Sequence, residues 1–265
     1  MAELISQTEL WETFIRIFLS GILLLFILII SFWQQLQMSK TIIVNYFRGL
    51  IQIVILAMVL VLIFNLKNLV VIYLYMFGMV IFSAFTARQR YKYVDILKME
   101  IIAISAGGLG VMVFVTLFSI IEPTGEYLIP MGGMVISNAM IWTTMTSERL
   151  TSDFIKNKSL IEASLSLGAS PRMAIYTLLR DAIQTPFTPS IDRIAVLGIV
   201  SIPGLLAGMI IGGENPIIAA VYQVIIFLMI QTAGLIAVVI ITYLLIQKFF
   251  NSLEQINYEL FTNNQ

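Results

Sequence analysis

Apolar residues in this chain form long runs, not the short alternating patterns that are typical of strands. Each run approaches the ~20 residues that an α-helix needs to cross the hydrocarbon core of a bilayer. Short polar segments separate the runs. We therefore predict an all-α, polytopic integral membrane protein with about seven transmembrane helices, over residues 14–32, 49–64, 69–85, 101–121, 128–144, 191–211 and 217–246.

Small residues and prolines inside these runs predict how the helices pack. Gly107, Gly108 and Gly110 would let the fourth helix approach its neighbours closely. Pro130 predicts a break near the start of the fifth helix, and Pro203 followed by glycine predicts an interruption of the sixth. The polar tail after Phe250 is expected to fray.

The segment 158–186 is more polar than its surroundings and reads as two helices outside the bilayer. Ser159 and Glu162 have the spacing of a capping box, which predicts a helix start. Gly168 suits the left-handed position after a helix end. Ser170 and Pro171 then resemble the N-cap and first residue of a second helix, which Pro186 would end.

Composition confines the chemistry that this chain can perform. Hydrophobic residues make up 59% of the chain and charged residues 11%, so lipid must be its solvent. Cysteine and histidine are both absent, which excludes disulfides, thiolate nucleophiles, histidine bases and His/Cys zinc sites. The chain contains no G-x-x-x-x-G-K-[ST] phosphate loop, so ATP hydrolysis would need another polypeptide.

Charge distribution predicts how the chain is oriented. The formal net charge is zero, which gives no reason to expect a nucleic-acid partner. Glu3, Glu9 and Glu12 precede the first run, which favours a retained span over a cleaved signal peptide. Cytoplasmic loops are enriched in Lys and Arg. With seven spans, one face of the membrane has only Arg16 and Lys67. The other face is therefore cytoplasmic, and it has Lys40, Arg48, Arg88, Arg90, Lys92, Lys98, Arg149, Lys156, Lys158, Arg172, Arg180, Arg193 and Lys248.

This partition predicts a multi-pass protein of the inner (plasma) membrane, with the N-terminus outside and the C-terminus in the cytoplasm. The segment 158–186 then projects into the cytoplasm, where a soluble partner could reach it. Glu162 has two interpretations there: it caps the helix together with Ser159, or it contacts the soluble partner protein.

A short pattern in this segment resembles the EAA loop of ABC-transporter permeases. It consists of Glu162, Ala163 and a serine, followed after three residues by Gly168. The surrounding motifs are similar to those of the FetB (YbbM) family of permeases. They are residues 133–140 (GMVISNAM), 164–171 (SLSLGASP), 188–192 (TPSID) and 201–204 (SIPG), then Gly208, Gly212 with Gly213, and Tyr222 with Gln223.

The resemblance implies the permease subunit of an ABC transporter. That family is associated with iron export in bacteria and has plant relatives implicated in aluminium tolerance. The chain would be a single permease domain, 1–265, that forms a homodimer and docks a cytoplasmic ATPase subunit. ATP and Mg would be bound by that partner, with no cofactor in this chain. The expected coupling residues are Glu162, Ala163, Gly168, Ser170 and Pro171, although residues 178–181 depart from the usual end of the EAA pattern.

Three polar residues in or beside apolar runs are candidates for the substrate path: Asn138, Asp192 and Gln223. Amides in membrane helices also bridge helices by hydrogen bonds, as Gln231 would too. Asp192 could instead cap a helix or pair with lipid headgroups. An ion-coupled secondary transporter is an alternative function. That class needs intramembrane carboxylates or broken helices, and Asp192 is the candidate carboxylate. The pattern assigns no metal ligands and leaves the substrate open.

Overall fold

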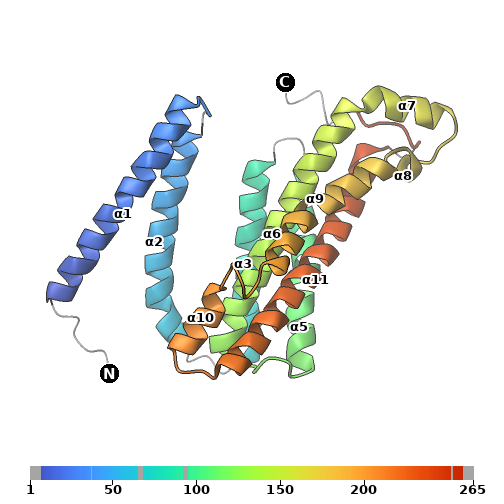
Figure 1. Ribbon diagram of the computed structural model, residues 1–265. Coiled ribbons are helices and arrows are strands. Elements are labelled where there is room, and N and C mark those ends of the chain that lie inside the picture. The colour runs from blue at the N-terminus through green and yellow to red at the C-terminus, as the bar shows by residue number, and fades with distance from the viewer. Residues whose placement is uncertain (1–6, 37, 65–67, 92–94, 252, 259–265) are drawn as a thin grey trace. The chain divides into compact units, whose positions relative to one another are not determined.

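The structure is a computed structural model that describes residues 7–36, 38–64, 68–91, 95–251 and 253–258, and within them it is built of helices without a named strand. The predicted all-α membrane class is therefore confirmed (Figure 1). The helices are α1 (Gln7–Trp33), α2 (Ser39–Phe64), α3 (Leu69–Arg90), α4 (Leu97–Ile104), the π-helix η1 (Ser105–Leu109), α5 (Gly110–Leu117), α6 (Gly125–Lys156), α7 (Lys158–Ser166), α8 (Pro171–Ala174), α9 (Tyr176–Ala195), α10 (Gly204–Ile211) and α11 (Pro216–Phe249).

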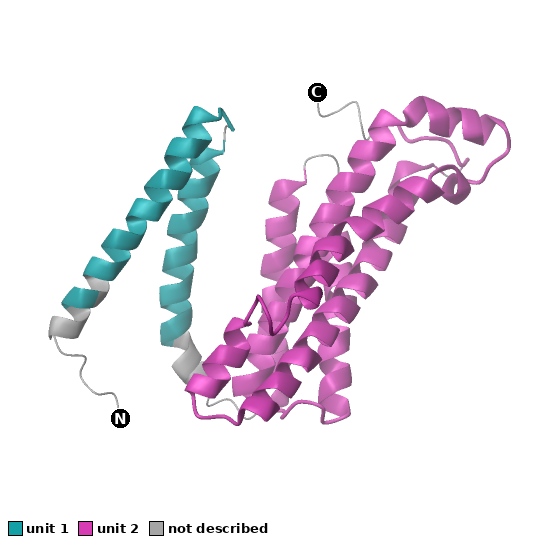
Figure 2. Ribbon diagram, viewed as in Figure 1, with its two compact units in different colours: residues 1–63 teal, residues 64–265 magenta. Residues whose placement is uncertain are grey.

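The chain divides into two compact units, residues 1–63 and 64–265 (Figure 2). The single domain expected over 1–265 stays a prediction. In the first unit, α1 and α2 form a helical hairpin whose turn includes Gln35, with a positive φ of 52°. The Ser31 and Ser39 hydroxyls meet across it at 3.2 Å.

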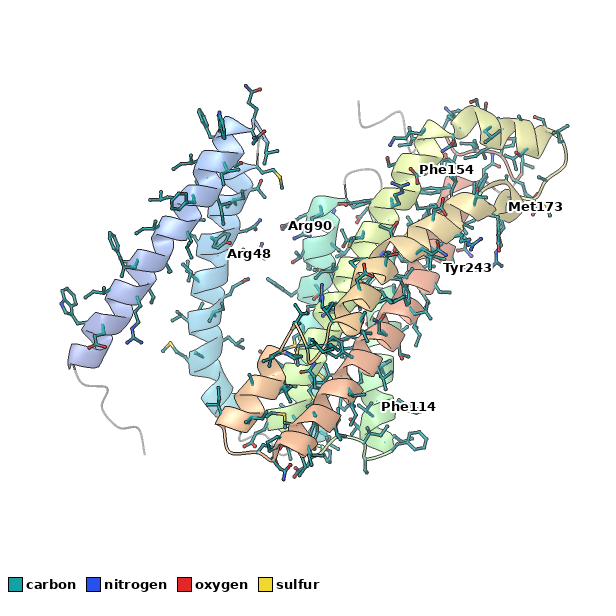
Figure 3. All side chains as sticks on the ribbon, viewed as in Figure 1. Arg48, Arg90, Phe114, Phe154, Met173 and Tyr243 are labelled. Carbon is teal, nitrogen blue, oxygen red and sulfur yellow. The ribbon has the colours of Figure 1, made fainter. Side chains whose placement is uncertain are left out.

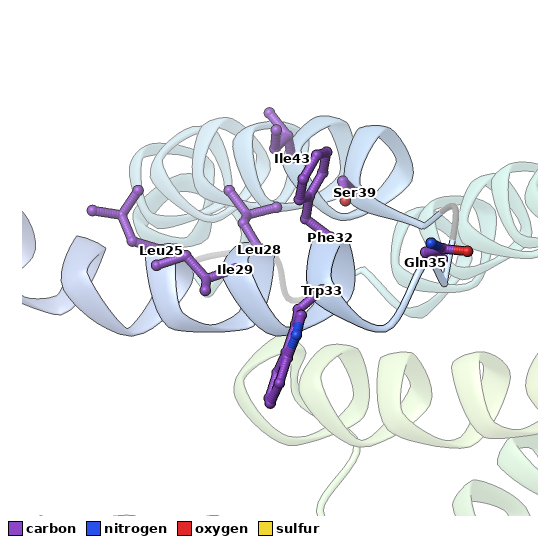
Figure 4. A pocket seen from close by; sticks show the side chains of 8 residues that line it. All are labelled: Leu25, Leu28, Ile29, Phe32, Trp33, Gln35, Ser39 and Ile43. Carbon is purple, nitrogen blue, oxygen red and sulfur yellow. The ribbon is translucent and has the colours of Figure 1, made fainter.

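An apolar groove of about 700 Å³ opens between α1 and α2 near this turn. Its lining is mostly aliphatic and aromatic, and Figure 4 shows Phe32 and Trp33 pointing in different directions from the end of α1. Both side chains are exposed. The polar side chains in its lining are Gln35 and Ser39, both at the turn.

The second unit has a core centred on α6 and α11, which pack along one another. Helices α3 and α9 pack against α6, and the rod made of α4, η1 and α5 packs against both central helices. On α3, the buried residues Ile72, Met76, Val80 and Ala84 recur at intervals of four. This spacing places them on one face of the helix, as core residues require.

Glycines let the central helices approach closely. A Cβ at Gly107 would collide with the backbone carbonyl of Ala233 on α11, and one at Gly108 would lie 3.0 Å from the Ile136 side chain on α6. Gly234 likewise lies against the Trp142 ring. The packing role predicted for Gly107 and Gly108 is confirmed, whereas Gly110 faces open space.

Two predicted helix interruptions are wrong, because proline is tolerated here within continuous helices. Pro130 lies inside α6, and Pro186 and Pro189 lie inside α9. A proline removes one backbone hydrogen bond, but packing against neighbouring helices can hold the helix together. For α9 these neighbours are α6 and α11.

The expected span over 191–211 is divided, and the break is longer than the interruption predicted at Pro203. Helix α9 ends at Ala195, a loop contains Gly198 with φ of 77°, and α10 begins after Pro203. Helices α9 and α10 both pack on α11 and follow one another along it (Figure 1). Six other helices in the described chain are long and apolar enough to span a membrane. The predicted count of about seven thus corresponds to six continuous helices and one divided pair.

The close contact at Gly107 generates the first prediction. Gly107→Ala should destabilise the protein by about 1–3 kcal/mol, since the added methyl group meets a backbone atom that can move only with α11. Gly110→Ala is the matched control, because its Cβ meets nothing within 4 Å. Thermal unfolding in detergent would measure both. Equal melting temperatures would contradict this packing.

Candidate functional site

The corner between α7 and α8 is formed by a glycine that ends one helix and redirects the chain. Gly168 has φ of 88°, as predicted. Its N–H donates to the Leu165 carbonyl at 2.9 Å, and the next N–H, of Ala169, donates to the Ser164 carbonyl at 3.1 Å. These two bonds make a Schellman motif, which satisfies the last carbonyl groups of α7.

The predicted capping box at Ser159 and Glu162 is wrong. Helix α7 begins at Lys158 with Asn157 as its N-cap, and no side chain caps it. The Asn157 amide instead donates to the Asp153 carbonyl of α6 at 2.8 Å. Because α6 ends at Lys156, a single residue separates the two helices, and Ser159 already lies inside α7. Glu162 is therefore free of a capping role.

The C-terminal segment packs back on this corner, so the expectation that the tail frays after Phe250 is wrong for residues 250–258. Phe250 and Ile256 form an antiparallel bridge, and both side chains are buried. The Lys158 ammonium lies 3.6 Å from the centre of the Tyr258 ring. Ser252 and residues 259–265 lie outside the described part of the chain.

A mostly polar cavity of about 740 Å³ lies between α7 and this segment. It is lined by Glu162, Gly168 and Ala169 on one side and by residues 253–256 and Tyr258 on the other. The Oε1 atom of Glu162 is buried without a hydrogen-bond partner among the described residues. Two predicted coupling residues, Glu162 and Gly168, thus line this cavity, whereas Ala163, next to Glu162 on α7, does not.

Large apolar side chains at the corner are exposed although they lie outside the candidate spans. Leu167 is 89% exposed and Met173 72%, and Figure 3 labels Met173 on this corner. Ser170 and Pro171 connect them, as the N-cap and first residue of α8. Exposed apolar groups on a protruding surface are typical of a docking site for another protein.

The predicted path residues are distributed over three helices. Asn138 lies on α6, where its amide donates to the Met134 carbonyl of the same helix at 2.8 Å. Asp192 is exposed near the end of α9, beside the break before α10. Gln223 is buried on α11, and its carbonyl oxygen has no partner in the described chain. No hydrogen bond between any two of the three is found, so their role in a path stays a prediction.

The helix-bridging role expected of an amide is confirmed for Gln231. Its amide donates to the Ser190 hydroxyl at 2.9 Å and so joins α11 to α9. The Trp142 and Phe187 rings, 4.6 Å apart, join α6 to the same stretch of α9. These contacts hold α9 on the core across its two prolines.

A buried carboxyl that the sequence pattern did not single out lies on α4. Glu100 is fully buried, and its Oε2 atom is hydrogen-bonded to the Thr143 hydroxyl of α6, with the two oxygens 2.6 Å apart. The predicted fourth span began at residue 101, which placed Glu100 in a loop. A signal was available, because Leu97 and Met99 extend the apolar pattern around it, and α4 does begin at Leu97.

The fold defines a polytopic α-helical membrane protein with a protruding helix–glycine–helix corner. Comparison with known proteins specifies it further. Residues 14–250 match the model of the uncharacterised protein family UPF0014, and the chain belongs to that family.

Several relatives are aligned with most of this chain, with three identical residues in ten. "Protein ALUMINUM SENSITIVE 3" of Arabidopsis thaliana is 30% identical over 92% of this chain and 89% of its own length. "Probable iron export permease protein FetB" of Escherichia coli is 30% identical over 86% and 89%. "UPF0014 membrane protein STAR2" of rice is 30% identical over 88% and 82%. No solved structure matches this chain. The resemblance to the FetB family is confirmed.

Proposed function

We propose that this chain is the transmembrane permease subunit of an ABC transporter that exports a metal ion, iron-like, or another small solute. A separate cytoplasmic ATPase subunit binds ATP and Mg and drives it. The observation that carries this proposal is the exposed apolar corner between α7 and α8, with Leu167 and Met173 outside the candidate spans. The name of the Escherichia coli relative, an iron export permease, supports the cargo class.

The chain's connectivity makes the corner suitable as a lever. Helix α6 passes through Asn157 into α7, and α8 passes through Ile175 into α9. A force on the corner therefore acts on α6 and α9 together, which also share the Trp142–Phe187 contact. Movement of two ATPase subunits toward one another would shift both helices. Asp192 lies in the last turn of α9, at its far end, just before the break that precedes α10.

A second copy of the chain completes this proposal. Residues 196–203 form non-helical backbone between α9 and α10, and the Ile199 and Val200 side chains there are exposed. Non-helical backbone at membrane depth is tolerated only when protein covers it or a water-filled cavity adjoins it. A two-fold homodimer would cover the break or place it along a shared path.

An ion-coupled secondary transporter is the second candidate, and the buried Glu100 is the observation that favours it. Transporters of that class combine intramembrane carboxylates with broken helices. Dependence of transport on ATP hydrolysis by a co-purifying ATPase separates the two candidates.

The first prediction here concerns Gly168. Valine is strained at positive φ by about 1–2 kcal/mol, so Gly168→Val should turn α8 away from the docking surface. We expect normal membrane insertion but loss of ATPase binding and of transport. Asparagine tolerates positive φ and has room, because a Cβ here meets nothing within 4 Å, so Gly168→Asn should retain both activities. Glu162→Ala should show a weaker defect. Pull-down of the ATPase and a transport assay would measure these variants.

Full binding and full transport by Gly168→Val would mean that the corner is only a connector. Equal loss in the valine and asparagine variants would mean that backbone conformation is not the cause.

The second prediction concerns orientation. The chain has no cysteine, so single cysteines can be introduced without background labelling. A cysteine at Lys158 should react with membrane-impermeant reagents only from the cytoplasmic side. Cysteines at Glu122 and Glu214, in the turns before α6 and α11, should react only from outside. Labelling of all three from one side would contradict the orientation. Lys67 and Lys92, part of the same charge pattern, lie outside the described residues.

A further inference from the structure

The Glu100 carboxyl sits in a hydrogen-bond arrangement with one hydrogen too few. The Thr143 oxygen lies 2.6 Å from Glu100 Oε2 and 3.0 Å from the Met140 carbonyl oxygen, and both of these are acceptors. A hydroxyl group has one hydrogen, so it can donate a linear hydrogen bond to only one of them. If Glu100 carries a proton, its O–H donates to Thr143, and Thr143 donates to the Met140 carbonyl. Both short contacts are then hydrogen bonds.

The burial of Glu100 also indicates that its carboxyl group carries a proton. Glu100 is 0% exposed, and its second oxygen, Oε1, has no hydrogen-bond partner among the described residues. An ionised carboxylate without a cation is costly in such a place, so carboxylates within membrane spans are paired, protonated or functional.

Four elements pack against α4, and their charged groups are occupied elsewhere or exposed. Arg88 of α3 lies 3.2 Å from Asp95, and Arg149 of α6 lies 2.7 Å from Asp153. The π-helix η1 has no charged residue. Of their tyrosines, Tyr73 bonds to Thr116, and Tyr127 stacks on Tyr222. Tyr75 is half-buried. The other charged and titratable side chains of these helices are exposed: Arg90, Glu126, Glu148, Lys156, Tyr243 and Lys248.

A row of buried hydroxyl groups leads from Glu100 toward the end of α3. Thr143, Ser147 and Thr151 are each fully buried and recur every fourth residue, on one face of α6. Each step is ~6 Å along the helix axis, so a proton that moves from one hydroxyl group to the next would need a water molecule between them. The Ser147 hydroxyl has no partner among the described residues, and Thr151 is 2.5 Å from the Tyr91 hydroxyl at the C-cap of α3. The row therefore ends at Tyr91, next to the exposed Arg90 in the last turn of α3.

We propose that Glu100 is a proton-binding site within the membrane-spanning bundle, and that its proton exchanges with the aqueous phase along the hydroxyl row from Thr143 to Tyr91. The site is independent of the energy source. It rests on the proposed function in one respect: in a permease, the bound proton would be the charge that is exchanged when a cationic cargo moves.

Infrared spectroscopy of the purified chain in lipid nanodiscs tests the site without an ATPase or a cargo, so its outcome is separate from that of the proposed function. The wild type should show the C=O band of a protonated carboxyl. The band should shift in D₂O and lose intensity as the pH is raised. It should be absent from Glu100→Gln and present in Glu148→Gln, the matched control with an exposed carboxylate on α6.

Two further variants test the hydrogen bond and the route. Thr143→Val should move the band to the frequency of a carboxyl that no longer donates to a hydroxyl. Tyr91→Phe should slow the exchange in D₂O, whereas Tyr73→Phe, at the other end of α3, should not.

A wild-type spectrum without the band would show that Glu100 is ionised and would overturn the proposal. A band that persists in Glu100→Gln would do the same, because another group would carry the proton. A band that never shifts in D₂O would mean that Glu100 is a sealed bridge between α4 and α6.

Discussion

The structure depends on one constraint: in hydrocarbon, the backbone must satisfy its own hydrogen bonds. Helices in the second unit accordingly continue through Pro130, Pro186 and Pro189, because ending them there would expose more polar groups than the prolines do. Close packing at Gly107 and Gly234 holds these helices together. The loop at 196–203 follows the same rule without a helix, because the N–H groups of Leu197, Gly198, Val200 and Ser201 all donate to carbonyl groups of residues 194–201.

The same constraint explains how a signal from outside the bilayer could reach its interior. Helices α6 and α9 are continuous rods that Trp142 and Phe187 join, and the short helices α7 and α8 connect them to the corner at Gly168. A rod transmits displacement where a loop would absorb it. The C-terminal segment stiffens the corner further, since Ile256 is buried there and Lys158 lies over Tyr258.

Local backbone chemistry could be predicted from the sequence, and the surroundings of a residue could not. The positive φ of Gly168 follows from glycine placed after a helical pattern. The capping box failed because α6 extends to Lys156 and leaves no room for a separate start at Ser159. Pro186 was read as a stop because sequence alone does not reveal the contacts that hold α9. Glu100 was missed because one residue's difference in a span boundary moves a carboxyl from a loop into the core.

The central claim is that an ATPase binds the α7–α8 corner, and site-directed crosslinking tests it most directly. A photoreactive amino acid would replace Leu167, or Leu117 as a control; both side chains are exposed, but Leu117 ends α5 within a candidate span. Mass spectrometry would identify the products. The account predicts that position 167, and not 117, captures a protein with the G-x-x-x-x-G-K-[ST] phosphate loop of an ATPase. Capture of that protein at neither position, or equally at both, would contradict it.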